Sequence, residues 1–341
     1  MGERIVAAMS GGVDSSVAAA ILREAGHDVV GVTMRLLPAA DVGDVRAVAE
    51  KLGFPHEVMD LRDEFRRAVV EPFLAAYAAG RTPLPCAACN HALKFGALLR
   101  RAGELGATAV ATGHYARVEP GEGGRWRLRR ARDASRDQSY FLYGITPERL
   151  SHIRFPLGEM TKDDVRAKAR ALGLANAEKP DSQEICFIPG GDTAGYLREK
   201  LGEKPGAIVD TAGRKVGEHS GVHFYTIGQR RGLNLQGTEP RHVVAVNAAT
   251  NTVIVGSEDD LLSSGCEVEG VNWIAAPRTG SVGVKIRSRH GPVPATVTPG
   301  VEGRVTVRFA EPQRSVTPGQ AAVFYAGDDL LGGGTIASAV R

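Results

Sequence analysis

The first third of the chain alternates short runs of β-branched and aliphatic residues with longer runs of helical periodicity. Such alternation is typical of strands that are joined by helices. Strands connected in this way form a parallel sheet with helices on both faces, and ligands bind at the carboxyl ends of the strands. We therefore expect a doubly wound α/β domain. Its first strands and helices are expected at residues 4–9, 15–25, 28–34, 42–53 and 56–61.

The α/β pattern continues further along the chain and then stops. A helix is expected at residues 90–105, a strand at 108–112, and another helix at 161–172, which opens on the N-terminal cap residues Thr161 and Asp164. The chain then changes to short alternating runs separated by Gly, Pro and Asn, which are typical of small antiparallel barrels. These strands are expected at residues 243–246, 252–255, 282–286, 304–309 and 321–325.

A chain of 341 residues is long enough for two or three domains. We expect an α/β nucleotide domain at residues 1–202, a small β-rich central module at 203–265 and a C-terminal antiparallel β-barrel at 266–341. Hydrophobic residues make up 43% and charged residues 24%, which excludes disordered and collagen-like chains. No apolar run approaches the roughly 18 residues of a membrane span, and the N-terminus has no secretion signal. We expect a cytoplasmic protein without a membrane partner.

Residues 10–17, Ser-Gly-Gly-Val-Asp-Ser-Ser-Val, follow the first strand and open the first helix. The two glycines let the backbone approach a ligand closely, and its N–H groups and hydroxyls can surround phosphates at the positive end of the helix. The run has neither the lysine of a Walker A loop nor the spacing of a dinucleotide-binding loop. It resembles the S-G-G-x-D-S signature of PP-loop ATP pyrophosphatases, which adenylate a carbonyl oxygen. In that resemblance Asp14 orients a magnesium ion.

Four cysteines are too few for a disulfide framework, and a C-x-x-C pair in the cytoplasm indicates redox or metal chemistry. Cys86 and Cys89 precede the helix expected at residue 90, whose dipole would lower the pKa of the Cys89 thiol and make it a nucleophile. Cys186 lies in the same domain, whereas Cys266 in the β-rich region is expected to be inert. Two readings stay open: reactive thiols, or an iron–sulfur cluster on the thiolates of Cys86, Cys89 and Cys186.

Several further motifs follow one another along the chain. They are Gly31-Val-Thr-Met34, Ala111-Thr-Gly-His-Tyr-Ala116, Asp137-Gln-Ser-Tyr-Phe141, Lys179-Pro-Asp-Ser-Gln-Glu-Ile-Cys-Phe187, residues 223–231 and Thr317-Pro-Gly-Gln320. With the phosphate loop they closely resemble the tRNA-specific 2-thiouridylase family over nearly the whole chain. The resemblance implies an enzyme that uses ATP and Mg to adenylate C2 of the wobble uridine of a tRNA. Sulfur from a cysteine persulfide then replaces the oxygen, and an upstream donor protein supplies that sulfur.

The resemblance also assigns roles to single residues. The cysteine matching Cys186 carries the persulfide, and the one matching Cys89 is the nucleophile. The ATP site is implied to comprise Ala8, Met9, Ser10, Gly11, Gly12, Val13, Asp14, Ser15, Met34 and Gly113. The implied tRNA contacts are Leu84, Pro85, Cys86, His114, Arg136, Asp137, Gln138, Arg287, Ser288 and Gln320.

Positive charge gathers in two segments after residue 120. Residues 125–136 hold six arginines around Trp126, and residues 278–308 hold six Lys and Arg against only Glu302. Arginines beside an aromatic ring can bind phosphates and stack on splayed bases. The alternative for the arginine run is the solvated face of a hairpin. Because the wobble base must leave the anticodon stack to react, a flipped nucleotide is expected.

Two residues depart from the family pattern. The usual Thr-Pro-Asn-Pro-Asp-x-x-Cys is replaced here by Thr82-Pro-Leu-Pro-Cys-Ala-Ala-Cys89, so Leu84 stands for a polar residue and Cys86 for an acid. This leaves the base contact open and raises the cluster alternative. Two other classes compete, a PP-loop small-molecule ligase such as a GMP or NAD synthetase and a catalytically inactive tRNA-binding protein. The ligase needs neither the cysteine pair nor a basic β-rich region, and the inactive binding protein needs no intact phosphate loop. The presence of these features therefore argues against both classes.

Overall fold

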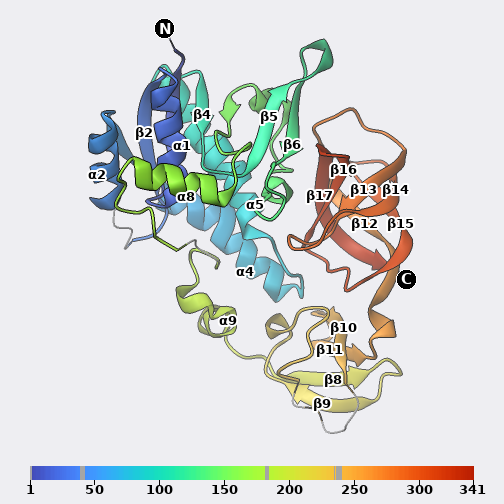
Figure 1. The fold of residues 1–341 in the computed structure, drawn as a ribbon. Helices are drawn as coiled ribbons and strands as arrows, with labels where there is room; N and C mark the ends of the chain where they lie inside the picture. The colour runs from blue at the N-terminus through green and yellow to red at the C-terminus, as the bar shows by residue number, and fades with distance from the viewer. Residues whose placement is uncertain (1, 39–42, 181–183, 234, 236–239) are drawn as a thin grey trace.

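The N-terminal region of the protein is built on a five-stranded parallel sheet (Figure 1). The computed structural model describes residues 2–38, 43–180, 184–233, 235 and 240–341. The order of the strands is β3-β2-β1-β4-β7, which confirms the expected α/β fold. Their bounds are β1 (Arg4–Ala8), β2 (Asp28–Arg35), β3 (His56–Asp60), β4 (Ala109–Ala111) and β7 (Ile153–Arg154).

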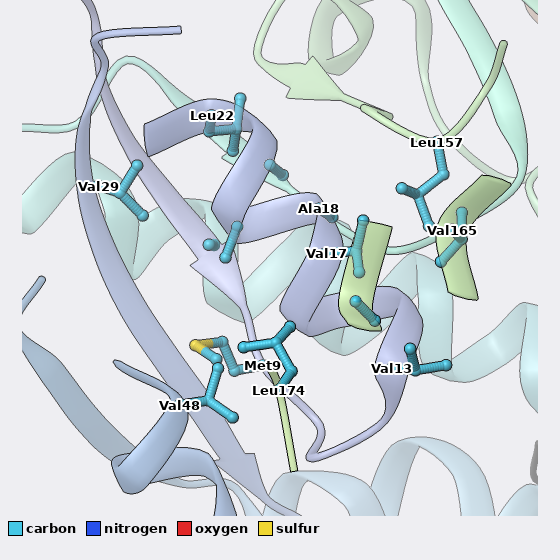
Figure 2. Packing of buried hydrophobic residues seen from close by; sticks show 14 of the residues in the cluster. Met9, Val13, Val17, Ala18, Leu22, Val29, Val48, Leu157, Val165 and Leu174 are labelled. Atoms are coloured by element: carbon cyan, nitrogen blue, oxygen red, sulfur yellow. The ribbon is translucent and has the colours of Figure 1, made fainter. Parts of the chain in front are cut away.

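Helices cover both faces of this sheet because successive residues of β1 are apolar. Ile5 and Ala7 face one side, where they belong to a core with α1 (Val13–Glu24), α2 (Gly43–Leu52) and α8 (Lys162–Ala171). Val6 faces the other side and packs in a second core with α6 (Leu98–Glu104). Figure 2 shows the first core, in which side chains of α1 meet residues of β2, α2 and α8; among those labelled are Val13, Val17, Leu22, Val29, Val48 and Val165.

The N-terminus of α8 has the cap that the sequence predicts. The Thr161 hydroxyl accepts from the Asp164 backbone N–H at 3.2 Å, and the Asp164 carboxylate accepts from the Thr161 N–H at 2.9 Å. These reciprocal bonds satisfy two donors that a helix start otherwise leaves unpaired. The cap therefore fixes the position of the first helical residue, Lys162.

Two runs of helix connect β3 to β4. The first comprises α3 (Arg62–Phe65), the π-helix η1 (Arg66–Val70) and α4 (Glu71–Ala78). The second is continuous through α5 (Pro85–Cys89), the π-helix η2 (Asn90–Ala97) and α6. The helix expected from residue 90 thus begins earlier, at Pro85. A proline has no N–H to donate and is favoured in the first turn of a helix.

A small central module follows α9 (Thr193–Leu201). Its four strands have the order β10-β11-β8-β9, and β11 runs parallel to β8 while the other pairs are antiparallel. The expectation of purely antiparallel strands was therefore wrong for this module, since the connection after β9 returns the chain to the far side of β8. The strands are β8 (Gly206–Asp210), β9 (Lys215–His219), β10 (His242–Asn247) and β11 (Thr252–Gly256).

The C-terminal region is a closed six-stranded antiparallel barrel, as expected. Its sheet closes because β12 pairs with both β15 and β17. The sheet also continues into the first region, since β6 of the β5–β6 hairpin pairs with β17 (Figure 1). These strands are β5 (Ala116–Pro120), β6 (Trp126–Arg130), β12 (Leu262–Trp273), β13 (Gly280–Lys285), β14 (Val293–Pro299), β15 (Val305–Arg314), β16 (Ala321–Ala326) and β17 (Asp329–Val340).

Short helices complete the described part of the chain. They are η3 (Glu122–Gly124), η4 (Ser139–Phe141), α7 (Pro147–Leu150), η5 (Pro189–Gly191), η6 (Val222–Phe224) and η7 (Asp259–Leu261). Within the described ranges, no helix combines the length and the apolar character needed to cross a bilayer.

Candidate active site

The loop between β1 and α1 has the geometry of an anion site. Gly11 has a φ of +76°, which favours glycine, and α1 starts after Gly12 without a side-chain cap. The Ser15 hydroxyl accepts from the Ser10 N–H and hydroxyl, both at 3.2 Å, and donates to the Gly12 carbonyl at 3.0 Å. The loop is thereby closed on itself, and the N–H groups at the start of α1 are left for a ligand.

Asp14 projects from this loop into an ion pair. The Lys162 ammonium lies 2.7 Å and 2.9 Å from the two carboxylate oxygens of Asp14, and the Tyr115 hydroxyl donates to Oδ1 at 2.9 Å. The Lys162 side chain is 7% exposed and that of Asp14 is 29% exposed. The carboxylate is thus bound by groups of the protein in this structure, and its expected role in orienting a magnesium ion stays a prediction.

Two residues that are distant from the loop in sequence are in direct contact with it. A Cβ on Gly113 would lie 2.7 Å from the Asp14 carbonyl carbon and the Ser15 nitrogen, so only glycine permits this approach. The Asn176 amide donates to the Gly11 carbonyl at 3.2 Å and to the Ser16 hydroxyl at 2.9 Å. Gly113 was expected at the ATP site from the resemblance and does lie against the loop.

Sequence reasoning missed Lys162, Tyr115 and Asn176 as parts of this site. The signals for the first two were present but were read as something else. Lys162 directly follows the helix cap at Thr161, and Tyr115 lies in the Gly-His-Tyr motif. Asn176 has no local signal, because its amide reaches the loop from a turn that is far away in the sequence.

The environment of Cys89 differs from the sequence expectation. Since the helix begins at Pro85, Cys89 ends its first stretch, α5, and does not stand at the N-terminus. Its side chain is buried, and burial raises the pKa of the thiol to about 11, with the neighbouring Cys186 and Cys86 raising it further and Lys94 opposing them. The predicted lowering of the Cys89 pKa by a helix dipole is therefore wrong.

Three of the four thiols lie close enough to influence one another. Burial is the largest cause of the raised pKa of both Cys86 and Cys186, and Cys86 raises the pKa of Cys186 further. Both residues still have solvent-exposed surface, so the protein surrounds their thiols without covering them completely. Cys266 lies apart in the barrel core, where burial raises its pKa to about 12. Among the described side chains, no group of three His, Cys, Asp or Glu is arranged to hold a metal ion.

The segment before the cysteines is held by the other two regions. The Thr82 N–H donates to the Pro318 carbonyl at 2.9 Å, and the Gln320 amide donates to the Thr82 carbonyl at 3.0 Å and the Pro83 carbonyl at 3.4 Å. The Thr82 hydroxyl donates to that of Thr226 in the central module at 3.2 Å. The start of the cysteine helix is thus set by the barrel and the central module.

The residues expected to contact tRNA fall into two groups. Several have their polar groups engaged inside the protein. The Asp137 side chain is 1% exposed, and its carboxylate accepts from the Ser139 hydroxyl; the side-chain oxygen of Gln138 accepts from the Tyr115 N–H. His114 is 9% exposed. Pro85 is buried, and the others lie at or near the surface or bond to backbone carbonyls; they are Leu84, Cys86, Arg136, Arg287, Ser288 and Gln320.

The arginines of the β5–β6 hairpin are paired with acids of the protein. Arg127 lies 3.0 Å from Glu119 and 3.3 Å from Asp329, and Arg129 lies 2.7 Å and 2.9 Å from the same two residues. These ion pairs join the hairpin to β17 of the barrel. This part of the arginine run therefore serves an internal contact. Residues 181–183 of the motif around Cys186 lie outside the described residues.

A parallel sheet whose first strand delivers this serine- and glycine-rich loop to the start of α1 defines a PP-loop nucleotide-binding protein. Three family models match the chain in order. They are the "tRNA methyl transferase HUP domain" at residues 3–190, the "tRNA methyl transferase PRC-barrel domain" at 194–257 and the "Aminomethyltransferase beta-barrel domain" at 263–336.

Proteins named tRNA-specific 2-thiouridylase MnmA match over almost the full length. The one from Geobacter metallireducens is 47% identical over 99% of this chain and 98% of its own. The one from Synechococcus sp. (strain JA-2-3B'a(2-13)) is 50% identical over 98% and 94%, and that from Solibacter usitatus 48% over 97% and 98%. The chain belongs to the tRNA-specific 2-thiouridylase family.

Proposed function

We propose that this protein is an ATP-dependent sulfurtransferase that converts the wobble uridine of tRNA to 2-thiouridine. One series of contacts carries the proposal. Gly113 lies against Asp14 of the phosphate loop, the next residue, His114, contacts Lys94, and the charge of Lys94 acts on Cys89. These links support a single site that contains the phosphate loop and the thiols, as a reaction that uses ATP first and sulfur second requires.

The first step activates the C2 oxygen of the uridine, which is a poor leaving group. The oxygen attacks the α-phosphorus of ATP, the bond from that phosphorus to the bridging oxygen breaks, and pyrophosphate leaves. Residues 10–15 and the open N–H groups of α1 are the groups that would hold the phosphates. Magnesium would enter the site with the nucleotide and would neutralise part of the charge of its phosphates.

The second step delivers sulfur through two cysteines. An upstream donor protein loads Cys186 with a persulfide. The Cys89 thiolate attacks Sγ of Cys186, the inner sulfur of the persulfide; the S–S bond of the persulfide breaks, a Cys89–Cys186 disulfide forms, and the outer sulfur leaves as hydrosulfide. Hydrosulfide adds to C2, AMP leaves with the original oxygen, and the remaining S–H proton passes to solvent. A dithiol reductant then reopens the disulfide and returns both thiols.

The tRNA would lie over the barrel and the mouth of the site. Of the basic residues between positions 278 and 308, Arg278, Arg289, Arg304 and Arg308 are exposed on the barrel, whereas Lys285 is buried. Phosphate contacts of this kind position an RNA, whereas single-stranded bases are recognised in pockets. Salt-sensitive binding of tRNA is therefore expected.

The test measures pyrophosphate release and 2-thiouridine formation with ATP, unmodified tRNA and a persulfide donor. Cys89→Ala should release pyrophosphate but form no 2-thiouridine, and the matched variant Cys266→Ala should do both. A Cys89→Ala protein that thiolates tRNA at the wild-type rate would contradict the proposal. The cluster alternative is tested by adding Cys86→Ala to this assay and recording the visible absorbance of the protein. A brown protein that needs Cys86 to form 2-thiouridine would indicate an iron–sulfur carrier in place of the persulfide.

A further inference from the structure

The helix that follows Cys89 is a π-helix, η2, and it contains Lys94. In an α-helix of 3.6 residues per turn, residues five apart point to different sides. A π-helix instead closes its hydrogen bonds between residues five apart, as the Leu98 N–H does here with the Leu93 carbonyl. Lys94 lies five residues after Cys89, so η2 turns it toward the side on which Cys89 lies.

The head group of Lys94 has a fixed partner. It lies 3.4 Å from Nε2 of His114, whose Nδ1 lies 2.6 Å from the Thr112 hydroxyl. Because an ammonium can only donate, Nε2 is the acceptor and Nδ1 carries the hydrogen, which it donates to Thr112. His114 is buried, and burial together with Lys94 holds its pKa well below the usual value, so the ring stays neutral and keeps accepting.

The Cys89 thiolate has no helix N-terminus to stabilise it. Cys89 is the last residue of α5, and among the described residues the other ionisable groups that act on its pKa are Lys94, Cys186 and Cys86. Of these, Lys94 alone carries positive charge, and it acts on all three thiols in the same direction. A positive charge near a buried thiol favours the thiolate, which is the attacking form.

We propose that Lys94, held in place by His114, supplies the positive charge that stabilises the Cys89 thiolate during sulfur transfer. The inference rests on the proposed function, because it assigns Cys89 a thiolate that reacts. It also gives His114 a positioning role, in which the ring orients Lys94 from inside the protein.

The test is the rate at which iodoacetamide alkylates each cysteine at a fixed, mildly alkaline pH, read peptide by peptide by mass spectrometry. Lys94→Met should slow alkylation of Cys89 about tenfold, the effect of losing one opposite charge near an ionisable group. Lys94→Arg should restore most of the rate. Arg100→Met removes an exposed positive charge from α6 of the same continuous helix and should leave the rate unchanged.

Cys266 provides an internal control. It is fully buried in the barrel core, so its alkylation reports general unfolding. The proposal is overturned if Cys89 is alkylated at the wild-type rate in Lys94→Met. It is also overturned if the alkylation of Cys89 slows only in a protein whose Cys266 reacts faster. The experiment needs neither tRNA nor ATP. A wild-type protein that fails to thiolate tRNA, while Lys94→Met still slows alkylation, would refute the proposed function and leave the thiolate stabilisation standing.

Discussion

The Lys162 ammonium lies 2.7 Å from the Asp14 carboxylate and thereby ties the N-terminus of α8 to the phosphate loop. We expect Lys162→Met to lower the free energy of unfolding by about 1–3 kcal/mol, because the pair is intermediate between an exposed and a buried salt bridge. ATP binding should weaken as well. Urea denaturation and nucleotide titration measure the two effects.

A double variant provides the control for this pair. Adding Asp14→Asn to Lys162→Met removes the unpaired charge and should recover part of the lost stability. Equal stability of Lys162→Met and wild type would show that the contact contributes nothing.

Gly113→Ala should weaken ATP binding sharply. The added methyl group would lie 2.7 Å from the backbone of Asp14 and Ser15, so the loop would have to move. Gly103→Ala is the matched control, since its Cβ meets nothing within 4 Å in α6. That change should stabilise the protein by up to about 1 kcal/mol. Unchanged nucleotide affinity in Gly113→Ala would contradict the importance of the close approach of Gly113, which follows β4, to the loop.

Gln320→Ala should slow sulfur transfer more than pyrophosphate release. The Gln320 amide holds the Thr82 and Pro83 carbonyls, and losing such a bond costs about 1 kcal/mol and loosens the start of the cysteine helix. Gln313→Ala serves as the control, because the side chain of this partly exposed glutamine of β15 donates to the Glu311 carbonyl only two residues away. Equal slowing of both half-reactions in Gln320→Ala would count against the role of this contact.

The protein should lose stability as the pH falls below about 6.5. The pKa of His114 is well below the usual value because the ring is buried, so the unfolded chain takes up a proton in a range where the folded protein does not. Protons then favour unfolding, and this residue's contribution falls by up to about 1.4 kcal/mol per pH unit, whereas above that range it is constant. Urea denaturation at several pH values measures the slope.

The control for the pH dependence is a histidine in a different setting. His114→Gln should flatten the slope, while His290→Gln changes an exposed ring and should leave it unchanged. A slope that is the same in His114→Gln and wild type would contradict the assignment.

Local patterns predicted the fold well because they reflect local forces. The cap of Thr161 with Asp164 and the apolar run of β1 depend on residues a few positions apart, and both were read from the sequence. The sequence analysis expected the cysteine helix from residue 90, but it begins at Pro85, because proline is favoured in a first helical turn.

The site was predicted only in part, because its residues meet through tertiary contacts. Lys162 reaches Asp14 across 148 positions, and Gln320 reaches Thr82 across 238. Neither pairing leaves a periodic signal. The direction of Lys94 depends on the π-helix η2, and the helix propensities of its residues do not distinguish a π-helix from an α-helix.

The most direct test of the central proposal follows one sulfur atom. Wild-type protein is loaded by a persulfide donor, and the Cys186 peptide is examined by mass spectrometry before and after ATP and tRNA are added. We predict one additional sulfur on Cys186 that disappears as 2-thiouridine forms, and no thiolation by Cys186→Ala. Normal thiolation by Cys186→Ala, or a sulfur that stays on Cys186 while 2-thiouridine forms, would contradict the account.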